Sequence, residues 1–129
     1  MADPVQIHQA AGCEIFEHPG FLRASVGPGL ADEVQECYRA LAAACITRAC
    51  KRVLIIGHST LDPFYHLAGR DALRSMALAG VPIDFRLAFV AMSAGLIAVY
   101  DAAVVEAGRL KLEARRFLTE EDAALWLAS

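Results

Sequence analysis

No apolar stretch in this 129-residue sequence is long enough to cross a membrane. The longest uncharged run, from Leu87 to Tyr100, falls short of the roughly 20 residues that a spanning helix needs. The N-terminal residues also lack the basic and apolar regions of a signal peptide. We therefore expect a cytoplasmic protein without a transmembrane segment, and we attribute the high mean hydropathy of +0.41 mainly to alanine.

Basic runs and metal-ligand patterns are missing as well. The formal net charge is −3 and basic residues occur at most in adjacent pairs, so a nucleic-acid partner is not expected. His58 and His66 lie close in sequence but have no third ligand at a suitable spacing. We therefore expect no metal and no cofactor.

The cysteines show no C-x-x-C pair and no zinc-ligand spacing from a histidine. They are Cys13, Cys37, Cys45 and Cys50. In a reducing cytosol, scattered cysteines are usually small core residues. We expect all four to be unpaired residues of the core.

The strongest local signal is the continuous apolar run from Val53 to Ile56, which is typical of a strand buried on both faces. Helix-start chemistry follows it at once. Thr60 or Asp62 can accept hydrogen bonds from free backbone N–H groups, and Pro63 suits the first helical position. Ligands of open α/β sheets bind beyond the carboxyl ends of the strands, so the turn 57–63 is a candidate site.

Turn residues and helical periodicity divide the rest of the chain. His18-Pro19-Gly20 separates two short strands, which predicts a hairpin over 13–26. Helices are expected at 30–50, at 62–79, from Ser93 to Gly108 and from Thr119 onward, and further strands at 83–92 and 110–117. Residues 1–11 carry little pattern and are expected to be a flexible N-terminus, with a single domain over 12–129.

This order predicts an α/β fold with a mixed five-stranded sheet, in which the N-terminal hairpin precedes parallel strands. Charges occupy alternate positions of four of the strands: Glu14, Arg23, Asp84, Arg86, Lys111, Glu113 and Arg115. Strands that alternate in this way have one polar face. We therefore expect two layers, with four helices mainly on one face and the polar face uncovered.

From Cys13 onward, the chain resembles the STAS superfamily, in particular the SpoIIAA-like (STAS/Sec14-like) group. The best match is the ending from Arg116 to Leu127, which resembles the closing strand and acidic-capped helix of that group, with its final Ala-x-x-Trp-Leu. The resemblance implies a β-α superhelix with helices on one side. It also implies a non-catalytic binding or regulatory module.

In STAS regulators of the anti-sigma-antagonist kind, the turn after the central strand carries Asp-Ser-Ser-Gly, and its serine is phosphorylated. Ser59 and Thr60 resemble the hydroxyl pair, whereas His58 and Leu61 replace the aspartate and the glycine. The resemblance implies that the turn 57–63 contacts a protein or binds a small apolar or anionic ligand. The candidate residues are His58, Ser59, Thr60, Asp62 and Tyr65.

A small serine hydrolase is the alternative, because Gly57-His58-Ser59 lies between a strand and a helix like the G-x-S-x-G nucleophile elbow. Leu61 replaces the second glycine that the cramped turn needs. His66 is the only later histidine, and it lies on the helix that the elbow would begin. It therefore cannot return from a separate loop to accept the serine proton, and this alternative is disfavoured.

Three apolar residues of the 62–79 helix fall outside its core face: Phe64, Leu67 and Leu78. They either lie under a loop or form a partner surface. Because symmetric dimers are the commonest soluble assembly, we expect a homodimer through these residues or through the uncovered sheet face. A regulatory protein partner is also expected.

Overall fold

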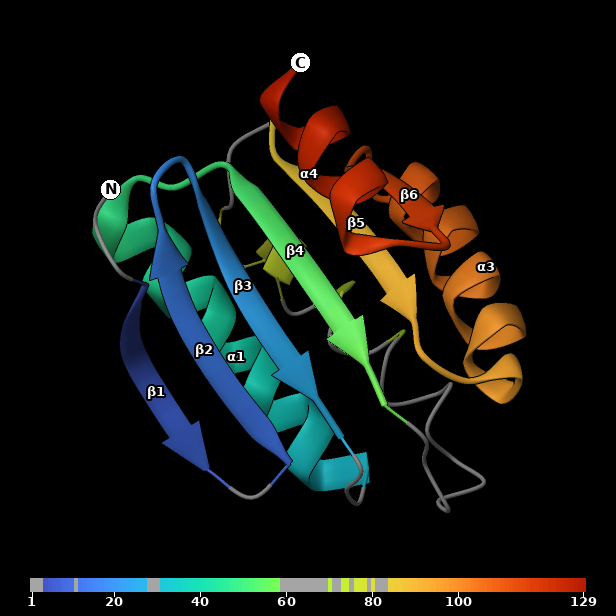
Figure 1. Cartoon of the computed structure of the whole chain (residues 1–129), viewed down its shortest axis with the longest axis horizontal. Coiled ribbons are helices and arrows are strands. Elements are labelled where there is room, and N and C mark those ends of the chain that lie inside the picture. Colours follow the sequence, from blue (N-terminus) through green and yellow to red (C-terminus); the bar gives the residue numbers. More distant parts are fainter. Residues whose placement is uncertain are drawn as a thin grey trace.

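The structure is a computed structural model that describes residues 4–10, 12–27, 31–58, 70, 73–74, 76–78, 80 and 84–129 (Figure 1). Its elements are β1 (Val5–Ala10), β2 (Cys13–His18), β3 (Phe21–Val26), α1 (Ala31–Arg48), β4 (Arg52–Gly57), β5 (Arg86–Ala91), α3 (Ala94–Arg109), β6 (Glu113–Phe117) and α4 (Glu120–Ala128). Residues 70, 73–74 and 76–78 are also helical. The α/β class predicted from the sequence is confirmed.

The sheet has six strands in the order β1-β2-β3-β4-β5-β6. The first three pair antiparallel, and β3 to β6 pair in parallel. The expected count of five strands is therefore wrong. The additional strand is β1, which lies within the N-terminal segment for which no strand was predicted. Its sequence alternates only from Val5 to His8, which is short for a strand signal, and its pairing with β2 includes an irregularity between Gln6 and His8.

The strand order explains why α1 and α3 share a face. Connections between parallel strands are almost always right-handed, and here every connection moves to the next strand in the same direction. The described crossover helices α1 and α3 therefore pack on one face, which we call the first face. Figure 1 shows α1 behind β1 to β3, and Leu73 and Met76 are buried in the same core.

The core under the first face contains apolar residues from α1, α3 and alternate positions of the strands. Ile15, Leu41 and Phe89 are fully buried there. Phe89 stacks on Tyr100 of α3, with ring centroids 4.8 Å apart. A Cβ at Gly57 would lie only 1.9 Å from Tyr100 Oη, so the close approach of α3 to β4 requires glycine at this position.

The opposite face, which we call the second face, is partly covered by α4. Ala123 and Leu127 pack on Leu54, Ile56 and neighbouring residues of β5. Figure 1 shows α4 in front of the sheet, on the side away from α1. The expectation that this face would be uncovered is therefore wrong over β4, β5 and β6. Over β1 and β2 its residues Gln6, Gln9 and Glu14 are exposed.

Two of the charged residues that led us to expect an uncovered polar face, Arg23 and Arg86, instead bind α4. Arg86 donates hydrogen bonds to the backbone carbonyls of Trp126 (3.1 Å) and Ser129 (2.9 Å), and its guanidinium lies 5.4 Å from the centroid of the Trp126 ring. At the other end of the helix, Arg23 bonds to Glu120 at 2.9 Å. An alternating charge pattern is therefore compatible with a covered face when the covering helix supplies the partners.

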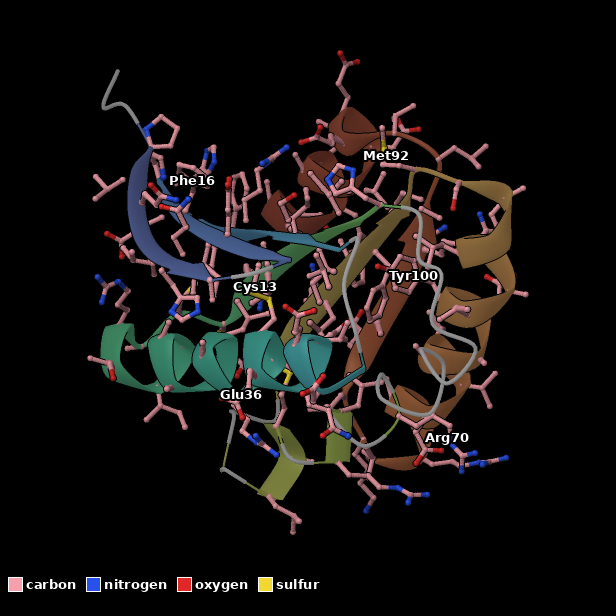
Figure 2. The ribbon with its side chains drawn as sticks, turned by 90° about the horizontal axis from the view of Figure 1, so that it is seen from below. Cys13, Phe16, Glu36, Arg70, Met92 and Tyr100 are labelled. Carbon is pink, nitrogen blue, oxygen red and sulfur yellow. A yellow bond between two sulfur atoms is a disulfide. The ribbon has the colours of Figure 1, made fainter. Side chains whose placement is uncertain are left out.

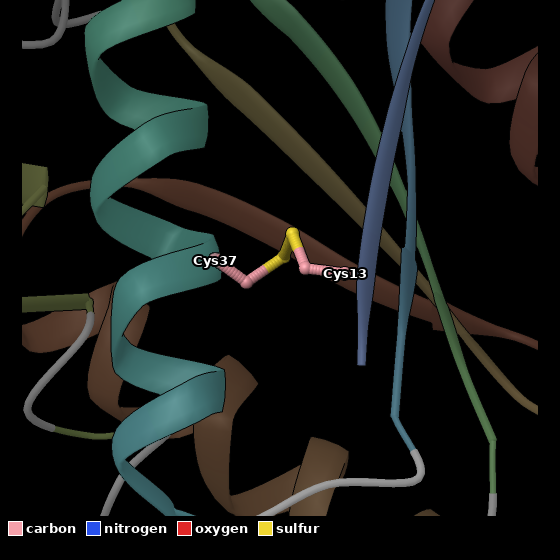
Figure 3. Close-up of a disulfide and its surroundings, with 2 residues drawn as sticks. All are labelled: Cys13 and Cys37. Atoms are coloured by element: carbon pink, nitrogen blue, oxygen red, sulfur yellow. A yellow bond between two sulfur atoms is a disulfide. The ribbon is translucent and has the colours of Figure 1, made fainter. Parts of the chain in front are cut away.

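A disulfide joins Cys13 of β2 to Cys37 of α1 (Figure 3). Both residues are buried, as expected, but the prediction that all four cysteines would be unpaired is wrong. The physical reason is proximity in the fold: β2 and α1 bring together two residues that are 24 positions apart in sequence. Cys45 and Cys50 are free.

The last helix was expected from Thr119 onward, and Thr119 caps it, because Thr119 Oγ1 accepts a hydrogen bond from the Asp122 backbone N–H at 3.2 Å. Ser93 occupies the equivalent position before α3 but makes no side-chain cap bond. Among the described residues, no helix combines the length and the apolar content that crossing a membrane requires.

Candidate functional site

His58 is the only residue of the predicted ligand-binding or regulatory site that the structure describes. Ser59, Thr60, Asp62 and Tyr65 lie outside the described residues. His58 directly follows β4, so it stands at the carboxyl edge of the parallel strands, as predicted. Its backbone N–H donates to Val26 O at 3.0 Å, which continues the pairing of β3 with β4.

The imidazole of His58 is hydrogen-bonded to Ser25 of β3, with 2.8 Å between Nε2 and Oγ. Ser25 pairs with Glu14 in the register of β2 and β3, so three polar residues meet on the second face at this edge. Sequence reasoning missed Ser25 because it precedes His58 by 33 positions. The alternation of β3 could have placed it on the polar face, but not beside His58.

Two large apolar side chains are exposed at the same edge. Met92 follows β5 and is 59% exposed, and Leu118 follows β6 and is 75% exposed. Because these strands are parallel and adjacent, their carboxyl ends lie side by side. Figure 2 shows Met92 on the side of the sheet that carries α4. The edge therefore combines a polar pair with exposed apolar surface.

The described strands contain no reversal of strand order, and so no topological switch point of the kind that forms ligand crevices in doubly wound sheets. The order of the described strands therefore gives no switch-point crevice beside His58. Among the described residues, no three His, Cys, Asp or Glu side chains are grouped closely enough to hold a metal ion.

Of the predicted partner surface, Leu78 is described and is 89% exposed, whereas Phe64 and Leu67 lie outside the described residues. The helical segment near Leu78 is tied to α3 by an ion pair. Arg74 bonds to the buried Glu106 at 3.0 Å, and this bond holds the pKa of the Glu106 carboxyl below its usual value. Arg109 approaches the same carboxylate at 3.4 Å.

A cavity of about 670 Å³ lies at the opposite edge of the sheet, and the sequence did not indicate it. The turn of the β2–β3 hairpin, the end of α1 and the start of β4 line it. These segments are distant in sequence, so no local motif could have found the cavity. Of the two free cysteines, Cys50 lines the cavity, whereas Cys45 is buried, and burial raises the pKa of its thiol to about 12.

Comparisons with protein-family models, with curated proteins and with solved structures found no match to this chain.

Proposed function

We propose that this protein is a non-catalytic binding or regulatory module of the SpoIIAA-like type. It acts through the carboxyl edge of its parallel strands and the turn 57–63, by contact with a regulatory protein partner or by binding a small apolar or anionic ligand. The observation that supports this proposal best is the composition of the edge, where the Ser25–His58 pair lies near the exposed Met92 and Leu118. Apolar residues mixed with hydrogen-bonding groups are typical of protein interfaces.

Protein contact is the better supported of the two modes. The order of the described strands has no reversal of the kind that opens ligand crevices, whereas the exposed Met92 and Leu118 are suited to contact with a protein. Ser59, Thr60, Asp62 and Tyr65 remain part of the proposed site by their position in the sequence. Phosphorylation of Ser59 or Thr60 would add a dianion next to His58, and that is a change large enough to reverse a protein contact.

Self-association belongs to the same proposal. The exposed Leu78 and the exposed Met92 supply apolar surface that a homodimer would cover. We expect sedimentation velocity to give a dimer, and a clean monomer at high micromolar concentration would contradict this part. A cytoplasmic location is also proposed, but the Cys13–Cys37 disulfide weighs against it, because such bonds are rare in a reducing cytosol.

The test compares variants in affinity capture from the native cell extract, with circular dichroism to confirm folding. Met92→Asp should abolish capture of the partner. Val105→Asp is the matched control, because Val105 is similarly exposed (58%) but lies on α3. Ser59→Asp should also abolish capture if the turn is a phosphorylation switch. Capture that survives Met92→Asp, or that Val105→Asp removes equally, would contradict the proposed edge.

A serine hydrolase is the second candidate, and the contact between Ser25 and His58 favours testing it. A hydroxyl hydrogen-bonded to an imidazole is the core of a nucleophile–base pair. The proposed binding module predicts no labelling by a fluorophosphonate probe. Labelling that disappears in Ser25→Ala or Ser59→Ala would identify the nucleophile and replace our proposal with the hydrolase.

A further inference from the structure

The cavity at the amino edge of the parallel strands has the size and the lining of a small-molecule site. Its volume of about 670 Å³ lies within the range of roughly 300–1,000 Å³ that is common for ligand pockets. It is separate from the carboxyl edge proposed above, because β3 and β4 run from this cavity towards Ser25 and His58. Its chemistry can therefore be considered independently.

An aromatic surface forms one wall of the cavity. His18 and Phe21 flank the hairpin turn and stack on each other, with centroids 4.8 Å apart and planes inclined by 12°. Partial burial, together with the nearby Arg23, lowers the pKa of His18, so its ring is predominantly neutral at pH 7. A planar apolar group can therefore stack on this surface without covering a charged ring.

Three basic residues and one acidic residue also line the cavity: Arg48, Lys51, Arg52 and Glu17. Arg48 pairs with Glu17 at 3.0 Å, and Lys51 pairs with Asp84 at 3.0 Å. Arg52 differs, because its guanidinium donates to the backbone carbonyls of Lys51 (3.1 Å) and Asp84 (2.7 Å). Three cationic groups against two carboxylates leave one net positive charge.

Arg52 is also held in place before any ligand arrives. Its two carbonyl contacts use Nη1, and the planar guanidinium has five N–H donors in all, so donors remain for an anion. Arg48 lies in the last turn of α1, where it complements the helix dipole, and is less available for a ligand. Arg52 is therefore the residue best placed to recognise a negative group.

We propose that this cavity binds a small aromatic carboxylate. The planar ring of the ligand stacks beside Phe21 and His18, and its carboxylate pairs with the guanidinium of Arg52. The combination of one apolar platform with one net positive charge selects this class over neutral aromatic compounds and over multiply charged anions such as nucleotides. The site needs no partner protein and no residue of the turn 57–63.

The test uses 2-naphthoate and its neutral amide, 2-naphthamide, in titrations of the full chain followed by NMR. We expect 2-naphthoate to bind saturably and to shift resonances of His18 and Phe21, and to bind about tenfold more tightly than the amide, because it gains a charge-assisted hydrogen bond. Arg52→Gln should remove that difference by weakening only the naphthoate. Arg115→Gln, at an exposed position of β6, is the matched control and should change neither affinity.

Titrations of the unmodified protein are sufficient to contradict the proposal. Absence of saturable naphthoate binding, equal affinity for the acid and the amide, or shifts centred on Ser25 and His58 would each contradict it, whether or not Arg52→Gln folds. Circular dichroism confirms the fold of each variant. A negative result in the naphthoate titration does not change the capture of a partner expected at the carboxyl edge. The two proposals are therefore tested separately.

Discussion

The first face of the sheet is covered by α1 and α3, which connect its strands, whereas α4, which follows the last strand, is the one described helix on the second face. On the first face, chain connectivity fixes the position of the helices, because each right-handed crossover must return to the next strand. On the second face, side chains fix the helix, through Arg23 and Arg86 at its two ends. Chain connectivity therefore fixes the helices on the first face, and specific side-chain contacts fix α4 on the second face.

This difference has an energetic consequence. The core under the first face includes buried residues of α1, α3 and the four strands β2 to β5, and the core under α4 is much smaller. A truncated side chain in the larger core leaves a cavity that many fixed neighbours surround, so little relaxation is possible. Next to α4, the short helix can shift to fill the space. The same substitution should therefore lower the free energy of unfolding more on the first face than on the second.

The largest expected effect is at Leu41, which is fully buried between α1 and the first face. Leu41→Ala should lower the free energy of unfolding by about 4 kcal/mol, because it leaves a cavity in a core that cannot collapse. Urea denaturation followed by circular dichroism measures this change. A loss no greater than that of the second-face variant Leu127→Ala would remove the proposed difference between the two faces.

The disulfide should contribute the next largest effect, because it ties β2 to α1 on the first face. The double variant Cys13→Ala/Cys37→Ala should be less stable than the oxidised protein by about 3 kcal/mol, as expected for a bond between residues 24 positions apart. Urea denaturation without reductant measures this loss. Thiol titration of the unfolded, unreduced protein should find Cys45 and Cys50 only, and four reactive thiols would contradict the pairing.

On the second face, Leu127→Ala should lower the free energy of unfolding by about 2 kcal/mol, at the low end for a buried leucine. Leu127 is 4% exposed and packs from α4 onto the sheet. The same urea experiment measures the loss, and amide hydrogen exchange should show faster exchange in α4 while α1 stays protected. Equal acceleration in both helices would show that α4 does not behave as a separately held layer.

The smallest effect is expected at the start of α4. Thr119→Ala removes the hydrogen bond from the Asp122 N–H and should cost about 1 kcal/mol. Ser93→Ala is the matched control at the start of α3, where no side-chain cap bond exists, and it should leave stability nearly unchanged. Thermal unfolding of both variants checks this pair, and equal losses would contradict the capping difference.

Sequence patterns predicted the elements that have strong periodicity. The apolar run of β4, the turn at Pro19 and the capped last helix all lie where they were expected. Strand β1 was missed because its alternation covers only Val5 to His8, and its pairing with β2 is what extends it to Ala10. For the candidate site, the sequence placed His58 at a strand end but did not identify Ser25, which only the pairing of β3 with β4 brings to it.

By itself, the sequence determined the α/β class and the carboxyl-edge position of His58, because local hydrophobic periodicity and turn chemistry act over a few residues. The tertiary structure alone decided that α4 covers half of the polar face, that Cys13 meets Cys37, and that Arg52 and Phe21 line one cavity. These features join residues that are distant along the chain. Their proximity depends on strand order and crossover direction, which no local pattern encodes.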